Sequence, residues 1–234
     1  MANGPSSFGT DPTDEAPTSS GGLDSGAPAN SSPEGGANLP GGFPEQSDAN
    51  LSAAETNANA CFSTDPIAGV TTQCPPPTGF KIEGDDDFRK KTTECLAKIG
   101  KTPSGAKMLK AIGDSGQTVT IKKTSGGNGA GPTDKSKAQP MADGSPGAGS
   151  GSTVYFNPDK PQIGDGSEDW MKRPACVGLA HELVHAYHNA NGTNDFTSKG
   201  EDLAVGVPPY DKEPVSENTI RSEWDPKQPA RTHY

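Results

Sequence analysis

The chain has 234 residues, of which 29% are hydrophobic, with 30 glycines, 23 prolines and a net charge of −10. Such a composition cannot supply a buried core along its whole length. All 20 basic residues lie in residues 81–234, and acidic residues balance their charge there. No basic patch therefore predicts nucleic-acid binding. No apolar stretch is long enough to span a bilayer, so membrane insertion is not expected.

Residues 1–79 are predicted to be a disordered, acidic tail that serves secretion or translocation. Residues 1–60 are rich in Gly, Ser, Pro, Ala and Asn, and their apolar residues are isolated. The start lacks the charged and apolar regions of a Sec signal peptide. A polar, Ser-rich, uncleaved start fits an export channel that threads unfolded chains, such as type III secretion. A plain solvated tail fits the same composition.

The four cysteines are Cys61, Cys74, Cys95 and Cys176. Cys61 and Cys74 could form a disulfide, but the sequence does not decide their redox state. No C-x-x-C is present, so a zinc ribbon is not predicted. Cys176 is expected to be a small packed residue, and all four thiols are expected to be reduced if the protein works in a cytosol.

The folded domain is predicted to cover residues 80–234 and to begin with two helices. Asp85–Ile99 starts with an acidic run that suits the positive end of a helix. Thr102–Ile112 has Thr102 as N-cap and Pro103 in its first turn. The apolar stripes expected in the core are Phe88, Cys95, Leu96 and Ile99 in the first helix and Met108, Leu109 and Ile112 in the second.

Two strands are predicted next, Gln117–Lys123 and Thr153–Phe156, because their apolar residues alternate. They could pair as a small hairpin or as part of a sheet. Residues 124–152 between them are rich in Gly and Ser and are predicted to form a flexible loop. A loop this long inside a domain is either disordered or a functional flap.

His181-Glu182-Leu183-Val184-His185 reads H-E-x-x-H within a helix predicted from Pro174 to Ala190. Two imidazoles four residues apart lie on one helix face and can bind a single Zn²⁺. Glu182 then lies beside the metal, where a general base can take a proton from a water that the metal activates. The motif predicts one catalytic zinc ion, and the alternative is an ordinary exposed helix.

A catalytic zinc needs three protein ligands and one open position. Glu201 is the predicted third ligand, because a polar loop before it lets the chain turn back over the metal. Glu217 and Asp195 are the other candidates. His188 lies too far along the helix to join both histidines, so it is expected beside the cleft. Asn191 occupies the position of the third metzincin histidine, which excludes that class.

Three blocks near the C-terminus resemble known zinc proteases. His181–Ala186, with His188 and Gly192, is similar to the metal helix H-E-L-x-H-A-x-H-x-x-x-G of the clostridial neurotoxin light chains. Glu201 with Val205-Gly206 resembles their E-x-x-T-F-G segment, and Arg231–Tyr234 resembles their R-x-x-Y pair. The series HELVHAYH, EDLAVG, SENTIRSE and RTHY resembles the NleD-type effectors still more. Those are type III secreted zinc endopeptidases of bacterial pathogens.

The resemblance covers about residues 150–234 and implies a compact α+β, zincin-like fold of the gluzincin group. It implies that Glu201 binds the zinc and that Arg231 and Tyr234 stabilise the transition state. It also implies delivery through type III machinery into the host cytosol and a host signalling protein as substrate, with a kinase as one candidate. A monomer is expected. Ala204 stands where the neurotoxins have Thr, and the connection from Gly192 to Gly200 is shorter than theirs.

The expected mechanism assigns two further tasks. Glu217 or Glu223 could orient a ligand histidine through its second ring nitrogen. Thr153–Phe156 could be an edge strand that binds the substrate backbone by strand addition, or an internal strand without a ligand.

The alternative function is a zinc-stabilised effector module that binds a host protein without catalysis. A structural zinc site fills all four positions, so His188, Asp195 or Glu217 would have to be the fourth ligand.

Overall fold

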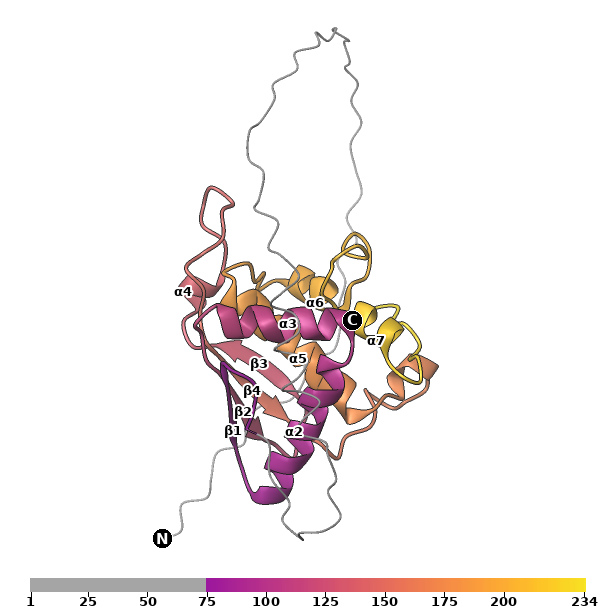
Figure 1. Ribbon diagram of the computed structural model, residues 1–234. Coiled ribbons are helices and arrows are strands. Elements are labelled where there is room, and N and C mark those ends of the chain that lie inside the picture. Colours follow the sequence, from indigo (N-terminus) through magenta and orange to yellow (C-terminus); the bar gives the residue numbers. More distant parts are fainter. Residues whose placement is uncertain (1–74) are drawn as a thin grey trace, which may run out of the picture. The chain divides into compact units, whose positions relative to one another are not determined.

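The structure is a computed structural model that describes residues 75–234, and it mixes α and β elements (Figure 1). Its strands are β1 (Phe80–Glu83), β2 (Val119–Lys123), β3 (Gly129–Pro132) and β4 (Ser152–Phe156). Its helices are α2 (Asp86–Gly100), α3 (Pro103–Asp114), α4 (Lys135–Ala138), α5 (Ala175–Ala190), α6 (Ser198–Val205) and α7 (Glu217–Glu223). None of these helices has the length and apolar character needed to cross a bilayer. The predicted tail falls almost wholly outside the described residues, as do Cys61 and Cys74.

The four strands form one sheet in the order β1-β2-β4-β3, so the prediction of a small sheet in an α+β domain is confirmed. β2 is parallel to both β1 and β4, and β3 is antiparallel to β4. The hairpin alternative is therefore wrong, because parallel strands need a crossover rather than a tight turn. Ile121 pairs with Val154 at the centre of the sheet, and both side chains are buried.

The crossover between β2 and β4 contains β3 and α4, so the prediction of a structureless loop at 124–152 is wrong for this part. The strand Gly129-Ala130-Gly131-Pro132 has low strand propensity, and its pairing with β4 rather than its composition makes it a strand. Because β4 is hydrogen-bonded on both sides, Thr153–Phe156 is an internal strand and the prediction that it is an edge is also wrong. β3 is the strand at that edge.

The two N-terminal helices form where the sequence predicts them. Asp85 caps α2 by accepting a hydrogen bond from the Phe88 N–H, and Thr102 caps α3 by accepting from the Gly105 N–H. The predicted apolar stripes are buried, except that Leu109 is only partly covered. Both helices pack against α5, so they form one wall around it.

Helix α5 is the central element of the domain. It contacts both β3 and β4, and it also packs against α2, α3, α6 and α7. Thirteen of its 16 residues are buried, although its sequence contains Glu, Asn and three His. A helix that is covered on nearly all sides holds its polar side chains in fixed positions, which suits a site built on a rigid scaffold.

A disulfide joins Cys95 of α2 to Cys176 in the first turn of α5, with the two Cα atoms 4.9 Å apart. The expectations that Cys176 is a free packed residue and that both of these thiols are reduced are therefore wrong. Both cysteines lie on the buried faces of their helices, so packing of α2 against α5 brings them within the distance that a disulfide requires. The pairing fixes the start of α5 to its neighbour.

Candidate metal centre

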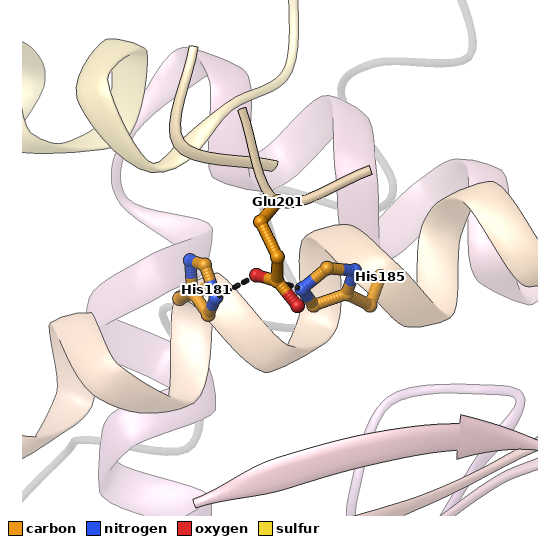
Figure 2. A group of neighbouring side chains, drawn as sticks. All are labelled: His181, His185 and Glu201. Atoms are coloured by element: carbon orange, nitrogen blue, oxygen red, sulfur yellow. Dashed lines mark hydrogen bonds and ion pairs between the residues drawn. The ribbon is translucent and has the colours of Figure 1, made fainter. Parts of the chain in front are cut away.

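Helices α5 and α6 bring together three side chains of the types that bind metal ions. His181 and His185 lie one turn apart on α5, and Glu201 reaches them from α6 (Figure 2). Oε2 of Glu201 is 3.4 Å from Nε2 of His181 and 3.1 Å from Nε2 of His185. The ligand atoms of all three residues lie within 4.8 Å of one another. Two imidazole nitrogens and a carboxylate oxygen are a donor set that zinc favours.

The turn before α6 depends on glycine. Thr197 caps α6 through the Lys199 N–H, so the helix begins at Ser198. A Cβ on Gly200 would lie 1.8 Å from the carbonyl oxygen of Asp195, so no other residue fits there without moving the turn. Gly206 ends the helix in the left-handed conformation, with φ of 78°. These features hold Glu201 over α5.

Glu217 contacts the far side of the His181 ring. Its Oε2 lies 2.9 Å from Nδ1 of His181, which is the distance of an ion pair although the angle is not that of a regular hydrogen bond. With Nδ1 facing Glu217, Nε2 faces Glu201 and His185. A carboxylate on the second nitrogen of a ligand histidine fixes the orientation of the ring. Glu217 therefore fixes the orientation of the His181 ring and is not itself in the cluster.

Three arginines share the Glu217 carboxylate. Its oxygens lie 2.7 Å from Nη2 of Arg221, 3.0 Å from Nη1 of Arg173 and 3.4 Å from Nη1 of Arg231. Glu217 and Arg221 are completely buried. Arg221 also donates to the carbonyl oxygens of Pro229 and Trp170, at 2.8 and 3.0 Å. The network ties α7 to the start of α5.

The titration of these groups follows from their contacts. Burial lowers the pKa of His181, but its contacts with Glu201 and Glu217 outweigh burial and raise that pKa to about 9. Burial would raise the pKa of both carboxyls, but the histidine contacts hold the pKa of Glu201 and of Glu217 below the usual range. Both carboxylates are thus ionised near neutral pH, and a metal ion competes with a proton for His181.

Glu182 directly follows His181 in α5 and takes part in none of these ion pairs. It is buried and makes no hydrogen bond with any residue of the range 75–234. Burial raises the pKa of the Glu182 carboxyl above its usual range, against the opposing effect of His181 and His185. An unpaired carboxylate with a raised pKa beside the candidate ligands suits a general base.

The other acidic and histidine candidates lie elsewhere. Nδ1 of His188 contacts Oγ1 of Thr193 at 3.0 Å, and burial with the nearby His185 lowers the pKa of His188 to about 4. Asp195 is partly buried and accepts a hydrogen bond from the Thr197 N–H. Glu223 accepts from the N–H and hydroxyl of Ser104, so the prediction that it orients a ligand histidine is wrong. None of these three joins the cluster.

The C-terminal segment folds over the site. Arg231 is 7% exposed, and its guanidinium carbon lies 5.3 Å from the centre of the Trp170 ring and 4.7 Å from that of Tyr234. The Tyr234 ring stacks on His181, with centroids 6.2 Å apart and ring planes 13° from parallel. The sequence motif Arg-x-x-Tyr therefore lies beside the predicted ligands, as expected from the resemblance.

A cleft of about 340 Å³ lies next to the candidate ligands. The residues that line it include His181, Glu182, Arg173, Arg231 and Tyr234. The sequence prediction missed Arg173 and the network around Glu217. Arg173 directly precedes Pro174 at the start of the predicted helix, which was the only local indication of its position.

The sequence profile of the Peptidase_M91 family, described as "Effector protein", matches residues 76–234. This match spans more than half of the chain. The chain belongs to the Peptidase_M91 family. Membership confirms the predicted resemblance to the NleD-type effectors and makes this protein a member of a peptidase family. None of the curated proteins matches the chain.

Two solved structures from Clostridium botulinum are similar to part of this family member. The neurotoxin serotype F light chain is 16% identical, with a TM-score of 0.33, and the alignment covers 50% of this chain and 38% of that one. The catalytic domain of the same serotype is 17% identical, with a TM-score of 0.32 and coverages of 56% and 40%. The chain thus spans about two fifths of the length of these structures.

Proposed function

We propose that the chain is a zinc-dependent endopeptidase of the zincin type that acts on a host protein. One observation carries the proposal: His181, His185 and Glu201 converge within 4.8 Å, with the unpaired Glu182 on the same helix. Membership of a peptidase family supports it independently.

The residues present fit a single zinc ion. His181, His185 and Glu201 would hold it, with Glu217 orienting His181. When bound, zinc supplies a Lewis acid that polarises a carbonyl group and lowers the pKa of water toward neutrality. Among the described residues the cluster has three members and not four, which favours an open catalytic site over a structural one.

The protein's own residues would move the protons and stabilise charge. Glu182 takes a proton from the attacking water and then delivers one to the leaving amine, for which its raised pKa suits it. Arg231 donates through Nε to the carbonyl oxygen of His233 and through Nη1 to Glu217, while Nη2 has no partner among residues 75–234. Nη2 of Arg231, with the Tyr234 hydroxyl, would stabilise the negative charge that develops on the carbonyl oxygen.

β3 replaces β4 as the strand expected to bind the substrate backbone. It lies at the edge of the sheet, ends at Pro132 and packs beside α5. A strand whose outer edge is unpaired can add an extended peptide through main-chain hydrogen bonds. The substrate would then run along β3 and past Glu182.

The biological setting is part of the proposal. Residues 80–234 would be the catalytic domain and residues 1–79 the acidic tail used in type III secretion, with activity in the host cytosol on a signalling protein such as a kinase. The description of the family as effector proteins supports this setting.

The test compares new protein ends in host-cell extract after treatment with the wild-type chain or with Glu182→Gln. Ends that appear only with the wild-type chain, while both proteins carry one zinc ion, support the endopeptidase. Identical end profiles for the two proteins contradict it and favour the non-catalytic binding module.

A further inference from the structure

Part of the cleft lining is a clasp formed by residues 160–173, in which two short segments run antiparallel. The N–H of Arg173 donates to the carbonyl oxygen of Pro161 and that of Ile163 to the carbonyl oxygen of Met171, each at 2.9 Å. Gln162 pairs with Lys172 between them. The clasp thus brings Lys160 and Arg173 to the same end, and both side chains line the cleft.

Arg173 extends from the clasp across helix α5. A Cβ on Gly178 would lie 3.1 Å from Nη2 of Arg173, so the guanidinium group passes directly over that glycine. Gly178 is one helical turn before His181 and Glu182, which places Arg173 beside the predicted reacting groups. Only Nη1 of Arg173 is paired, with Glu217, so Nε and Nη2 have no partner among residues 75–234.

Lys160 supplies a second cation. Its side chain is exposed and forms no ion pair with any residue of the described range, and its Nζ lies 3.9 Å from where a Cβ on Gly127 would be. Gly127 also lines the cleft. Lys91 and Lys123 form ion pairs at the surface. Lys160 forms none and points over the cleft.

The charges lining the cleft do not balance. Lys160, Arg173 and Arg231 contribute three positive charges, and Glu182 is the only acidic residue that lines the cleft. Glu217 does not line the cleft, and its single carboxylate is shared by Arg173, Arg231 and the completely buried Arg221. An excess of positive charge in a partly enclosed cleft attracts an anionic group.

We propose that Lys160 and Arg173 form an anion-binding subsite of the proposed peptidase, and that its substrates carry an anionic side chain within a few residues of the cleaved bond. This inference rests on the proposed function, but it concerns substrate choice and not catalysis. The unpaired N–H groups of Arg173 can bind a carboxylate or a phosphate, and Lys160 adds a second charge at the mouth of the cleft. Aspartate, glutamate and phosphoserine share this chemistry.

Charge reversal at Lys160 tests the subsite with a matched control. Lys172→Glu makes the same change on the same clasp, at an exposed lysine that does not line the cleft. Cleavage sites in a peptide library prepared from a cell extract are mapped by mass spectrometry for the wild type and both variants. Acidic residues should be enriched near the cleaved bond for the wild type and Lys172→Glu. Lys160→Glu should reduce this enrichment at least about ten-fold, since it replaces an attractive charge by a repulsive one.

Binding provides a second readout that needs no turnover. In the zinc-loaded Glu182→Gln background, fluorescence anisotropy measures binding of labelled random decapeptides whose central residue is fixed as Asp, phosphoserine, Ala or Lys. An affinity for Asp or phosphoserine at least about ten-fold above that for Ala, lost in Lys160→Glu and kept in Lys172→Glu, supports the subsite and identifies which anion it prefers. Equal affinity for all four libraries overturns it. Cleavage that requires Glu182 but shows no enrichment of acidic residues overturns the subsite and supports the peptidase. Absence of Glu182-dependent cleavage contradicts the peptidase, and the binding measurement then decides the anion-binding site by itself.

Discussion

Replacing Glu217 by glutamine should reduce the free energy of unfolding by about 3–5 kcal/mol. Glutamine keeps the shape of the side chain, so the change removes a charge and creates no cavity. The carboxylate is completely buried, contacts His181 and is shared by Arg173, Arg221 and Arg231. Without it the completely buried Arg221 has no anionic partner, and leaving a buried charge unpaired is the costly case.

The assay is equilibrium unfolding in urea of the chelator-treated protein, followed by tryptophan fluorescence. Trp170 is a suitable reporter because its carbonyl oxygen accepts a hydrogen bond from Arg221. Glu94→Gln is the matched control, since Glu94 is exposed on α2 and its substitution should change stability by less than about 0.5 kcal/mol. A loss below about 1 kcal/mol for Glu217→Gln would refute the reasoning, because a buried carboxylate shared by three guanidinium groups could not then be important for stability.

Three further outcomes are expected. In competition with a fluorescent chelator, Glu201→Gln should weaken zinc binding at least about ten-fold. Asp195→Asn should not weaken it, because Asp195 lies outside the cluster. Equal losses of zinc affinity in the two variants would contradict the ligand assignment. Arg231→Lys should lower kcat by about 100-fold in a peptide-cleavage assay, since one donor to the developing oxyanion is displaced, and an unchanged kcat would exclude that role. The double variant Cys95→Ala, Cys176→Ala should lose up to about 4.5 kcal/mol of unfolding free energy in urea, because the bond closes a loop of 81 residues; no loss would show that the pairing does not stabilise the domain.

Local patterns predicted the helices well. The caps Asp85 and Thr102 and the stripe of Phe88, Leu96 and Ile99 each follow from residues within one or two turns of one another. The H-E-x-x-H spacing likewise put His181 and His185 on one face of α5. Glu201 is predicted as the third ligand because the polar loop before it lets the chain turn back over α5. Its carboxylate lies beside His181 and His185, as that prediction requires.

Features that depend on tertiary pairing were missed. β3 is a Gly-rich segment that becomes a strand only because β4 lies beside it, and no local preference indicates this. The disulfide between Cys95 and Cys176 requires the packing of two helices 81 residues apart in the sequence. The Glu217 network joins arginines from the clasp, α7 and the C-terminal segment. Charged residues are expected at the surface, yet Glu217, Arg221 and Arg231 are buried in the fold.

The most direct test is a crystal structure of the zinc-loaded protein, with anomalous scattering measured at the zinc absorption edge. We expect one zinc peak between Nε2 of His181, Nε2 of His185 and an oxygen of Glu201, at about 2.0–2.2 Å from each. We also expect a fourth position that no protein side chain occupies. A peak elsewhere, or one with a fourth protein ligand, would contradict the proposed catalytic centre.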